Sequence, residues 1–543
     1  MRRIIILLGL LVLLWMGWRL VDDPAPGEGA GDADTLAVLH RGNGPEPESL
    51  DPQIARSDSS GAILRDLFEG LTRLDPDGKV IAGAAASWDV SPDGRTYTFH
   101  LRPAARWSNG DPLTAHDYVF SMRRLVDPET AAAFAFFLSP VINAPEIIAG
   151  DRPATALAVV ALDEHTLEIS LRAPTPYLPG VLTHPANFPV HRPSLGHHGR
   201  EFTRPGNLVS NGAYVLSEAV IGSHYSMEKN PNYWDAENTA IAKVVYHQIA
   251  NQNAELARFR AGELDITYTV PNNQFALAAK NYPDQLRVSP QLTTYYYGFN
   301  LRRAPFAGQR GLRRALSMVV DRKLLAGSIL TAGQKPATGW VPPGVANYTA
   351  IEPEWAAWTM AQRLAEARRL YRTAGFSAAN PLKIEIRYNS ADIHRNIAVA
   401  IASIWRETLG VQASQLNVEF QVLLQDMRNG KADVFRSSWI ADYDDAFTFL
   451  EIMRTGAAAN FVGYANPDYD DLLGRAAATP DADRRRVLLQ EAEAIMLEDQ
   501  PLMPIYFYVN KRMVASRVKG WQNNSLNIHY SQDLSLAGAD AAD

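Results

Sequence analysis

Few residues in this chain are spaced for covalent or metal chemistry. There is no cysteine, which excludes disulfides, thiol nucleophiles and thiolate-bound metals. One SxxK spacing occurs at Ser226–Lys229 without the SDN and KTG motifs that accompany it in acyl-serine enzymes. His197 and His198 are adjacent, but no nearby ligand spacing completes a tetrahedral metal set. Phosphate-binding loops, nucleophile elbows and HExxH motifs are also missing, so we expect no catalytic residues, metal or cofactor.

Aromatic residues that carry a polar atom are numerous and partly clustered. The chain has 11 Trp and 21 Tyr, with clusters at Tyr295–Tyr297, at Trp439 with Tyr443, and at Tyr506–Tyr508. Tyr and Trp combine apolar area with a hydrogen-bonding group, which suits the wall of a site that encloses varied ligands. Most aromatic residues of a large protein pack in its core, so both roles stay open for these clusters.

Strand-like and helix-like segments alternate along the chain and must position these residues. Five segments rich in β-branched or aromatic residues are predicted strands: Tyr97–Leu101, Thr166–Leu171, Tyr295–Asn300, Lys383–Tyr388 and Ile505–Val509. Asp93-Gly94 predicts a hairpin turn before the first of them. Mixed strands and helices throughout the chain indicate an α/β protein with more than one sheet.

Two segments have the features of amphipathic helices. Met360–Ala374 is ended by Gly375, and Asn396–Leu409 is ended by Gly410. In the second segment four apolar residues recur at helical spacing and are predicted core residues: Ile397, Ile401, Ile404 and Trp405.

Length and charge limit the classes of function. A chain of 543 residues is longer than one hydrophobic core usually supports, so two or three lobes are expected. The formal net charge of −7 argues against a nucleic-acid partner, which would require a basic face. The share of charged residues, 20%, is ordinary for a globular protein and argues against disorder.

The first 34 residues have the pattern of an export signal followed by a linker. Arg2 and Arg3 precede an unbroken apolar run, Ile4–Trp18, and residues 22–34 are rich in Pro, Gly, Ala and Asp. As a helix the run would span about 22 Å, less than the hydrocarbon core of a bilayer at about 30 Å. No cysteine follows the run, which excludes a lipoprotein anchor. We expect export to the periplasm, with cleavage or retention on the inner membrane by Ile4–Trp18 both open.

Short sequence stretches in a consistent order resemble the bacterial extracellular solute-binding proteins of family 5, which serve peptide ABC importers. Together the stretches span about residues 35 to 530. They include Glu48–Pro52, Arg65–Leu71, Tyr97–Arg102, Trp107–Gly110, Thr114–Tyr118, Asn211–Tyr214, Asn230–Asp235, Gly262–Asp265, Thr294–Tyr297, Glu352–Trp355, Tyr388-Asn389 with His394, Ala402–Trp405 and Ala441–Tyr443.

The resemblance implies a fold and a division into domains. The family fold is α/β, a two-lobed periplasmic-binding-protein (Venus-flytrap) fold with an extra inserted domain (type II, cluster C). By position, residues 1–34 would be the signal or anchor segment and linker, and residues 69–192 the inserted domain. Lobe I would comprise residues 35–68, 193–292 and 510–543, and lobe II residues 293–509. Ligand binding would close the lobes about two joining strands.

The resemblance also implies a ligand site with a charged residue for each end of a peptide. Asp442, in the Ala-Asp-Tyr motif, takes the position of the family aspartate that binds the ligand ammonium. Arg436 and His394 occupy positions that contribute basic residues along the cleft, where an arginine fork can bind a carboxylate. The remaining candidate site residues are the aromatic walls Trp439, Tyr443, Phe420 and Tyr296.

This chain departs from the family pattern at the carboxylate end. A family arginine aligns with Met427 and a family lysine is lost near Leu330, although Arg428 and Lys335 lie close by. Arg428 is therefore a further candidate site residue. The cysteine pair often present in the family is replaced by Thr293 and Ile440.

The resemblance implies a monomeric protein that captures short peptides in a closing cleft and presents them to ABC permease subunits in the inner membrane. Three alternatives stay open. The ligand could be a murein tripeptide, a dipeptide, haem or another small solute, because function depends on the site and not on the fold. The protein could be a cell-surface peptidase, or a membrane-tethered peptide sensor or chaperone.

Overall fold

Three sheets of four or more strands carry the part of the chain that the computed structural model describes, residues 37–537. The first has the order β1-β10-β9-β8 and consists of Val38–Gly42, Lys243–His247, His224–Lys229 and Tyr214–Val220. The second has the order β4-β5-β7-β6 and consists of Ala85–Val90, Thr96–Leu101, Thr166–Ser170 and Val159–Ala161. The third has the order β12-β16-β11-β15-β13-β14 and consists of Lys335–Pro336, Leu502–Met513, Leu286–Phe299, Val434–Ile440, Lys383–Asn389 and Gln412–Val418.

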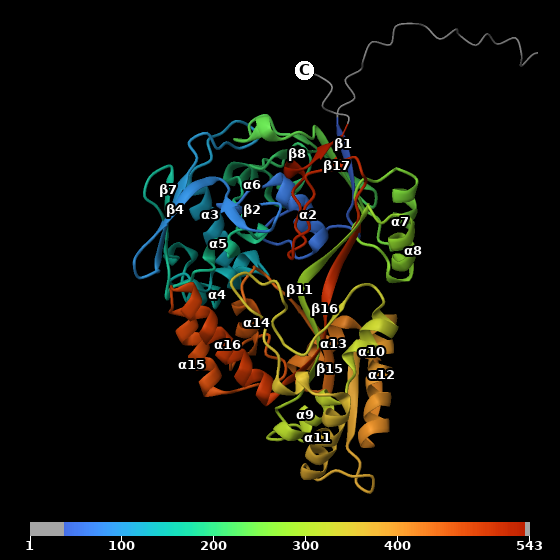
Figure 1. Cartoon of the computed structure of the whole chain (residues 1–543). Coiled ribbons are helices and arrows are strands. Elements are labelled where there is room, and N and C mark those ends of the chain that lie inside the picture. The colour runs from blue at the N-terminus through green and yellow to red at the C-terminus, as the bar shows by residue number, and fades with distance from the viewer. Residues whose placement is uncertain (1–36, 538–543) are drawn as a thin grey trace, which may run out of the picture. The chain divides into compact units, whose positions relative to one another are not determined.

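The long strands β11 and β16 join two groups of elements, which we call lobe I and lobe II. Lobe I is built around the β1-β10-β9-β8 sheet, lobe II around β13, β14 and β15, and the insert around the β4-β5-β7-β6 sheet. Figure 1 shows β11 and β16 side by side between the lobes, and the two strands pair antiparallel. Their register shifts between the pair Pro290–Val509 and the pair Thr294–Phe507. The ladder is therefore interrupted between the lobes.

Helices begin and end where the sequence provides capping residues. α2 (Asp58–Leu67) follows Ser57, whose side chain accepts a hydrogen bond from the backbone N–H of Ser60. α11 (Met360–Thr373) begins with a capping box. α12 (Asp392–Leu409) ends at Gly410, which has a φ of 77° that favours glycine.

The other α-helices and the short strands have the following bounds, apart from several short 3-10 segments. The helices are α3 (Ala115–Val126), α4 (Ala144–Ile148), α5 (Leu178–Val181), α6 (Arg192–His198), α7 (Gln252–Arg260), α8 (Phe275–Asn281), α9 (Arg310–Met318), α10 (Arg322–Leu325), α13 (Phe420–Arg428), α14 (Phe447–Leu450), α15 (Pro467–Ala477) and α16 (Ala482–Asp499). The strands are β2 (Thr72–Leu74), β3 (Val80–Ala82), β17 (Val518–Lys519) and β18 (Ser535–Leu536).

The six-stranded sheet separates two apolar cores. Successive side chains of a strand point to opposite faces, so Tyr295 and Tyr297 pack in one core with Trp405 from α12. Tyr296 packs in the other core against Trp340. Because of this alternation, neighbouring residues of β11 and of β15 lie on opposite faces of the sheet and in different cores.

The predicted strands and helices are confirmed with differences at their ends. α12 begins one turn before the predicted Asn396, and β11 and β16 extend well beyond Tyr295–Asn300 and Ile505–Val509. Both strands cross the predicted domain boundaries at residues 292/293 and 509/510, because each is continuous through the joining region. Those boundaries stay a prediction.

Candidate functional site

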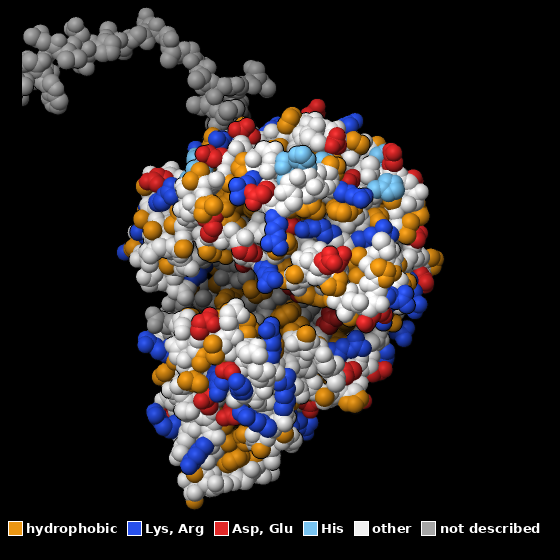
Figure 2. All heavy atoms as spheres, turned by 180° about the vertical axis from the view of Figure 1, so that it is seen from behind, with side chains coloured by type: hydrophobic (Ala, Val, Ile, Leu, Met, Phe, Trp, Pro, Cys, Tyr) orange, Lys and Arg blue, Asp and Glu red, His pale blue; other side chains and the backbone are white. Residues whose placement is uncertain are grey.

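A cavity of about 570 Å³ lies between lobe I, the insert and lobe II. Figure 2 shows the surface hollowed where the lobes face each other. Lobe I contributes α2 and residues 41–43 and 526–529, the insert contributes residues 180 and 183–185, and lobe II contributes the loop of residues 440–444. Residues 508–512 of β16 form the wall between them. The volume is in the usual range for a small-molecule site, about 300–1,000 Å³.

Asp442 brings a carboxylate to this cavity from the loop that follows β15. Its side chain is partly buried, and its backbone N–H donates to Thr448 Oγ1 at 3.4 Å. Within residues 37–537 no Lys, Arg or His nitrogen lies within 4 Å of the carboxylate. Burial raises the pKa of Asp442 to about 7, and the nearby Glu451 adds to the increase. The carboxylate is therefore desolvated without a positive charge beside it in this part of the chain.

The two acids beside Asp442 are engaged within the protein. Asp445 forms a bidentate ion pair with Arg485, at 2.6 and 2.8 Å. Asp444 accepts a hydrogen bond from the backbone N–H of Ala346 at 2.8 Å. Asp442 thus differs from Asp445 in having no cationic partner within the described residues, and the only donor to its carboxyl group that bears on its pKa is the Thr448 hydroxyl.

Tyr443 holds the loop of residues 440–444 against the insert. Its ring stacks on Tyr177 of the insert with 4.9 Å between the ring centroids. The Arg485 guanidinium lies 5.7 Å from the same Tyr177 ring. Tyr443 also lines the cavity. The stack fixes the position of Asp442, the preceding residue, relative to the cavity.

Arg436 and His394 lie together on the other side of the aromatic wall. The Arg436 guanidinium lies 4.7 Å from the Tyr295 ring and donates to Asn389 Oδ1 at 3.1 Å and to the Tyr508 hydroxyl at 3.2 Å. His394 Nδ1 is 3.2 Å from the Tyr295 hydroxyl. Burial, with the charge of Arg436, lowers the pKa of His394 to about 3, so this imidazole is neutral at pH 7. Tyr508 lines the cavity, but the predicted site residues Arg436 and His394 do not. They lie behind it, hydrogen-bonded to Tyr508 and to Tyr295 respectively.

The remaining predicted site residues do not line the cavity in this structure. Tyr296 and Trp439 lie on the opposite face of the sheet from Arg436, where Tyr296 packs edge-on against Trp340. Phe420 begins α13 and is 45% exposed, and Arg428 is exposed at the end of that helix. Of the substituted positions, Leu330 lines the cavity and Met427 is buried in the lobe II core, and Lys335 lies exposed on β12.

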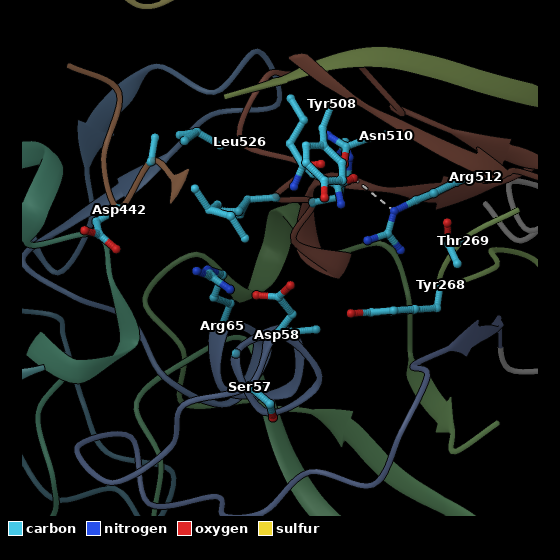
Figure 3. A pocket seen from close by; sticks show the side chains of 18 of the residues that line it. Ser57, Asp58, Arg65, Tyr268, Thr269, Asp442, Tyr508, Asn510, Arg512 and Leu526 are labelled. Carbon is cyan, nitrogen blue, oxygen red and sulfur yellow. Dashed lines mark hydrogen bonds between the residues drawn. The ribbon is translucent and has the colours of Figure 1, made fainter. Parts of the chain in front are cut away.

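The lobe I wall carries cavity-lining residues that the sequence analysis did not select. Figure 3 shows Arg65, Tyr268, Asn510 and Arg512 on this wall, with Asp442 across the cavity from Arg512. Lys511 lines the cavity next to Arg512. A usable signal was present in the sequence, since the basic pair Lys511-Arg512 directly follows the aromatic cluster Tyr506–Tyr508 and Asn510.

Within residues 37–537 no three His, Cys, Asp or Glu side chains are grouped to hold a metal ion. Over the same range, no helix has the length and apolar character needed to cross a bilayer. The predicted export segment, Ile4–Trp18, lies outside this range.

Comparisons with known proteins place the chain in a family. The sequence profile of the bacterial extracellular solute-binding proteins, family 5 (middle region) matches residues 79–461. The periplasmic oligopeptide-binding protein OppA of Salmonella typhimurium is 39% identical over 487 residues, which is 89% of each chain. The probable deoxycholate-binding periplasmic protein YgiS of Escherichia coli is 37% identical over 500 residues, 92% of this chain and 93% of the relative.

A solved structure supports the same placement. The murein tripeptide-binding protein MppA of Escherichia coli superposes with a TM-score of 0.80 at 37% identity, covering 92% of this chain and 99% of that chain. The predicted two-lobed α/β fold is therefore confirmed, and the family is one of solute-binding proteins and not of enzymes. The chain belongs to the bacterial extracellular solute-binding proteins, family 5.

Proposed function

We propose that this chain is the extracytoplasmic substrate-binding protein of an ABC importer and that it captures short peptides in the cavity between its lobes. The observation that carries the proposal is Asp442, a partly buried carboxylate at the cavity without a cationic partner in residues 37–537. A free α-ammonium group is small, positively charged and able to donate three hydrogen bonds. It therefore supplies what this carboxylate lacks.

The wall around Asp442 suits the rest of a peptide. A bound peptide needs partners for its backbone groups and room for its side chains. Tyr443 and Tyr508 offer apolar ring surface at the cavity, and Arg436 positions Tyr508 through a 3.2 Å hydrogen bond. We assign Arg436 to this positioning role in the unliganded form.

Closure of the lobes would complete the site. Ligand contacts that exist only in a closed arrangement shift the population toward it. The interrupted ladder between β11 and β16 is a suitable place for the bend. We retain the domain division proposed from the sequence, with the joining strands as the boundary between lobe I and lobe II.

Ligand classes other than ordinary peptides differ in what they would offer Asp442. Deoxycholate, in the name of one relative, is a carboxylate without an ammonium group and would leave the Asp442 charge uncompensated. A murein tripeptide with a free amino end would satisfy Asp442 and is the nearest alternative. We further propose that the protein has no catalytic activity, acts outside the cytoplasm and delivers its ligand to permease subunits.

Isothermal titration calorimetry with trialanine and N-acetyl-trialanine tests the proposal. The wild type should bind trialanine, and acetylation or the Asp442→Asn substitution should each weaken binding by about 2–5 kcal/mol, because each removes one partner of a desolvated pair. Asp471→Asn, at an exposed aspartate on α15, is the matched control and should bind as the wild type does. Equal binding of both peptides by the wild type would contradict the proposal.

A further inference from the structure

Three cations of the lobe I wall line the cavity. Arg65 projects from the last turn of α2, and Lys511 and Arg512 are consecutive residues of β16. Lys511 is only 8% exposed. In Figure 3 Asp442 and Arg512 lie at opposite ends of the view, and Arg65 lies between them beside Asp58.

The hydrogen-bond acceptors of Lys511 and Arg512 are uncharged amide and carbonyl oxygens, and one nitrogen of Arg65 has no acceptor in the described residues. Arg512 donates to Asn527 Oδ1 at 3.0 Å and to the backbone carbonyl of Thr267 at 3.1 Å. Lys511 donates to Asn272 Oδ1. The Arg65 Nε atom is buried without a hydrogen-bond partner. By contrast, Arg41 on β1 reaches Asp66 at 4.0 Å.

No carboxylate within residues 37–537 lies within 4 Å of Arg65, Lys511 or Arg512. Asp58, at the start of α2, lines the same cavity and is exposed. Glu255 is buried behind the wall, where its carboxylate accepts the backbone N–H of Tyr268 at 2.8 Å.

Burial governs the protonation of the wall, and at Arg512 the nearby carboxylates Glu255 and Asp58 offset it only in part. Burial lowers the pKa of Lys511 to about 8, and burial with the nearby charge of Arg41 lowers the pKa of Arg512 to about 10. Desolvation of a cation without a counter-ion destabilises its charged form, and a bound anion would reverse that effect.

We propose that Arg65, Lys511 and Arg512 form a carboxylate subsite on lobe I. The inference rests on the proposed function and names the second charged end of the ligand. Guanidinium groups bind carboxylates through two parallel hydrogen bonds, and the lysine adds a point charge. The subsite takes the place of the family cations that this chain replaces with Met427 and Leu330.

The two charged subsites belong to different lobes. A zwitterionic peptide would place its ammonium at Asp442 of lobe II and its carboxylate at the lobe I wall. Its charges would then connect the lobes and favour closure. The carboxylate can be the C-terminus or an acidic side chain, and both present the same group to the wall.

Calorimetry with trialanine, trialanine amide and Ala-Glu-Ala amide tests the subsite on the full chain. The wild type should bind trialanine at least tenfold more tightly than its amide. Lys511→Met should weaken trialanine binding about tenfold and leave amide binding unchanged, so that the ratio between the two peptides approaches one. Lys280→Met, at an exposed lysine of α8, should keep the wild-type ratio. If Lys511→Met does not fold, Arg65→Gln on α2 provides the same comparison.

The third peptide identifies the source of the carboxylate. Tight binding of Ala-Glu-Ala amide, lost in Lys511→Met, would assign the subsite to an acidic side chain and still support it. Equal wild-type affinities for all three peptides, with binding that still requires Asp442, would overturn the subsite and leave the proposed function intact. Failure of every peptide to bind the wild type would overturn the proposed function itself.

Discussion

Lowering the pH from 7 to 5 is expected to weaken peptide binding through Asp442. Burial raises the pKa of this carboxyl group to about 7 in the unliganded protein, so it is half protonated at pH 7. A protonated carboxyl group cannot form an ion pair, and a bound ammonium favours the ionised form. Binding below pH 7 must therefore release a proton from Asp442, and affinity must rise as the pH increases.

The magnitude follows from the ionised fraction of Asp442. With a pKa of about 7, that fraction is about one half at pH 7 and about one hundredth at pH 5, so the association constant should fall about fiftyfold. The α-ammonium of the peptide has a pKa of about 7.7–8.0 and stays protonated over this range. Above pH 8 the ammonium itself deprotonates, so affinity should decrease again.

Calorimetry of trialanine binding at pH 5, 6 and 7, in two buffers that differ in ionisation enthalpy, measures both the affinity and the released proton. About one proton per peptide should be released near pH 5.5. Asp442→Asn should bind weakly with no pH dependence below 7. Glu255 and Glu493, whose pKa values burial also raises to about 7, remain in that variant. The same pH dependence in Asp442→Asn would assign it to another group and refute the reasoning.

Three further predictions concern the stability contributed by Asp442 and the cluster of Arg436 and His394 with Tyr295 and Tyr508. Because the folded-state pKa of Asp442, about 7, exceeds its unfolded value, stability from the bound proton is present below pH 4 and lost as the pH rises to 7. Unliganded Asp442→Asn should therefore be more stable than the wild type at pH 8 by about 1–2 kcal/mol, but not at pH 4, and an equal melting temperature at pH 8 would contradict this. His394→Gln should change trialanine affinity at pH 7 by less than about threefold, because His394 is already neutral. Arg436→Met should lower the free energy of unfolding in urea by about 2–3 kcal/mol, because it loses hydrogen bonds to Asn389 and Tyr508; a loss no larger than that of His394→Gln would argue against the cluster.

Local sequence patterns predicted the elements better than their ends. The helical repeat of Ile397, Ile401 and Trp405 gave a buried helix face, and all three are 0% exposed. The apolar repeat extends one turn earlier, because Ile393 stands four residues before Ile397 and packs against the same core, and the prediction that began at Asn396 missed this first turn. Strand extensions depend on pairing between β11 and β16, which are more than 200 residues apart in sequence.

The position of a site residue could be predicted from the sequence only where it does not depend on other segments of the chain. Asp442 lies at the cavity, as the Ala-Asp-Tyr stretch predicts, although its role in binding stays a proposal. The placement of Tyr296 and Trp439 depends on strand register, which turns them to the face away from Arg436. The state of His394 depends on its burial beside Arg436. The lobe I wall assembles α2 and β16, and no local pattern indicates that Arg65 and Lys511 line the same cavity.

The register shift in the long strand pair has a mechanical consequence. Residues 291–293 of β11 lie between two stretches of regular ladder, and Gln291 lines the cavity. A pair of strands bends with least resistance where the ladder between them is interrupted, although Leu292 still donates to the Ser525 carbonyl at 3.0 Å and accepts from the Ala441 N–H at 2.8 Å, so these two neighbours must move with it. The pivot and the ligand are then neighbours, and a modest rotation at the pivot becomes a large displacement at the distant ends of both lobes.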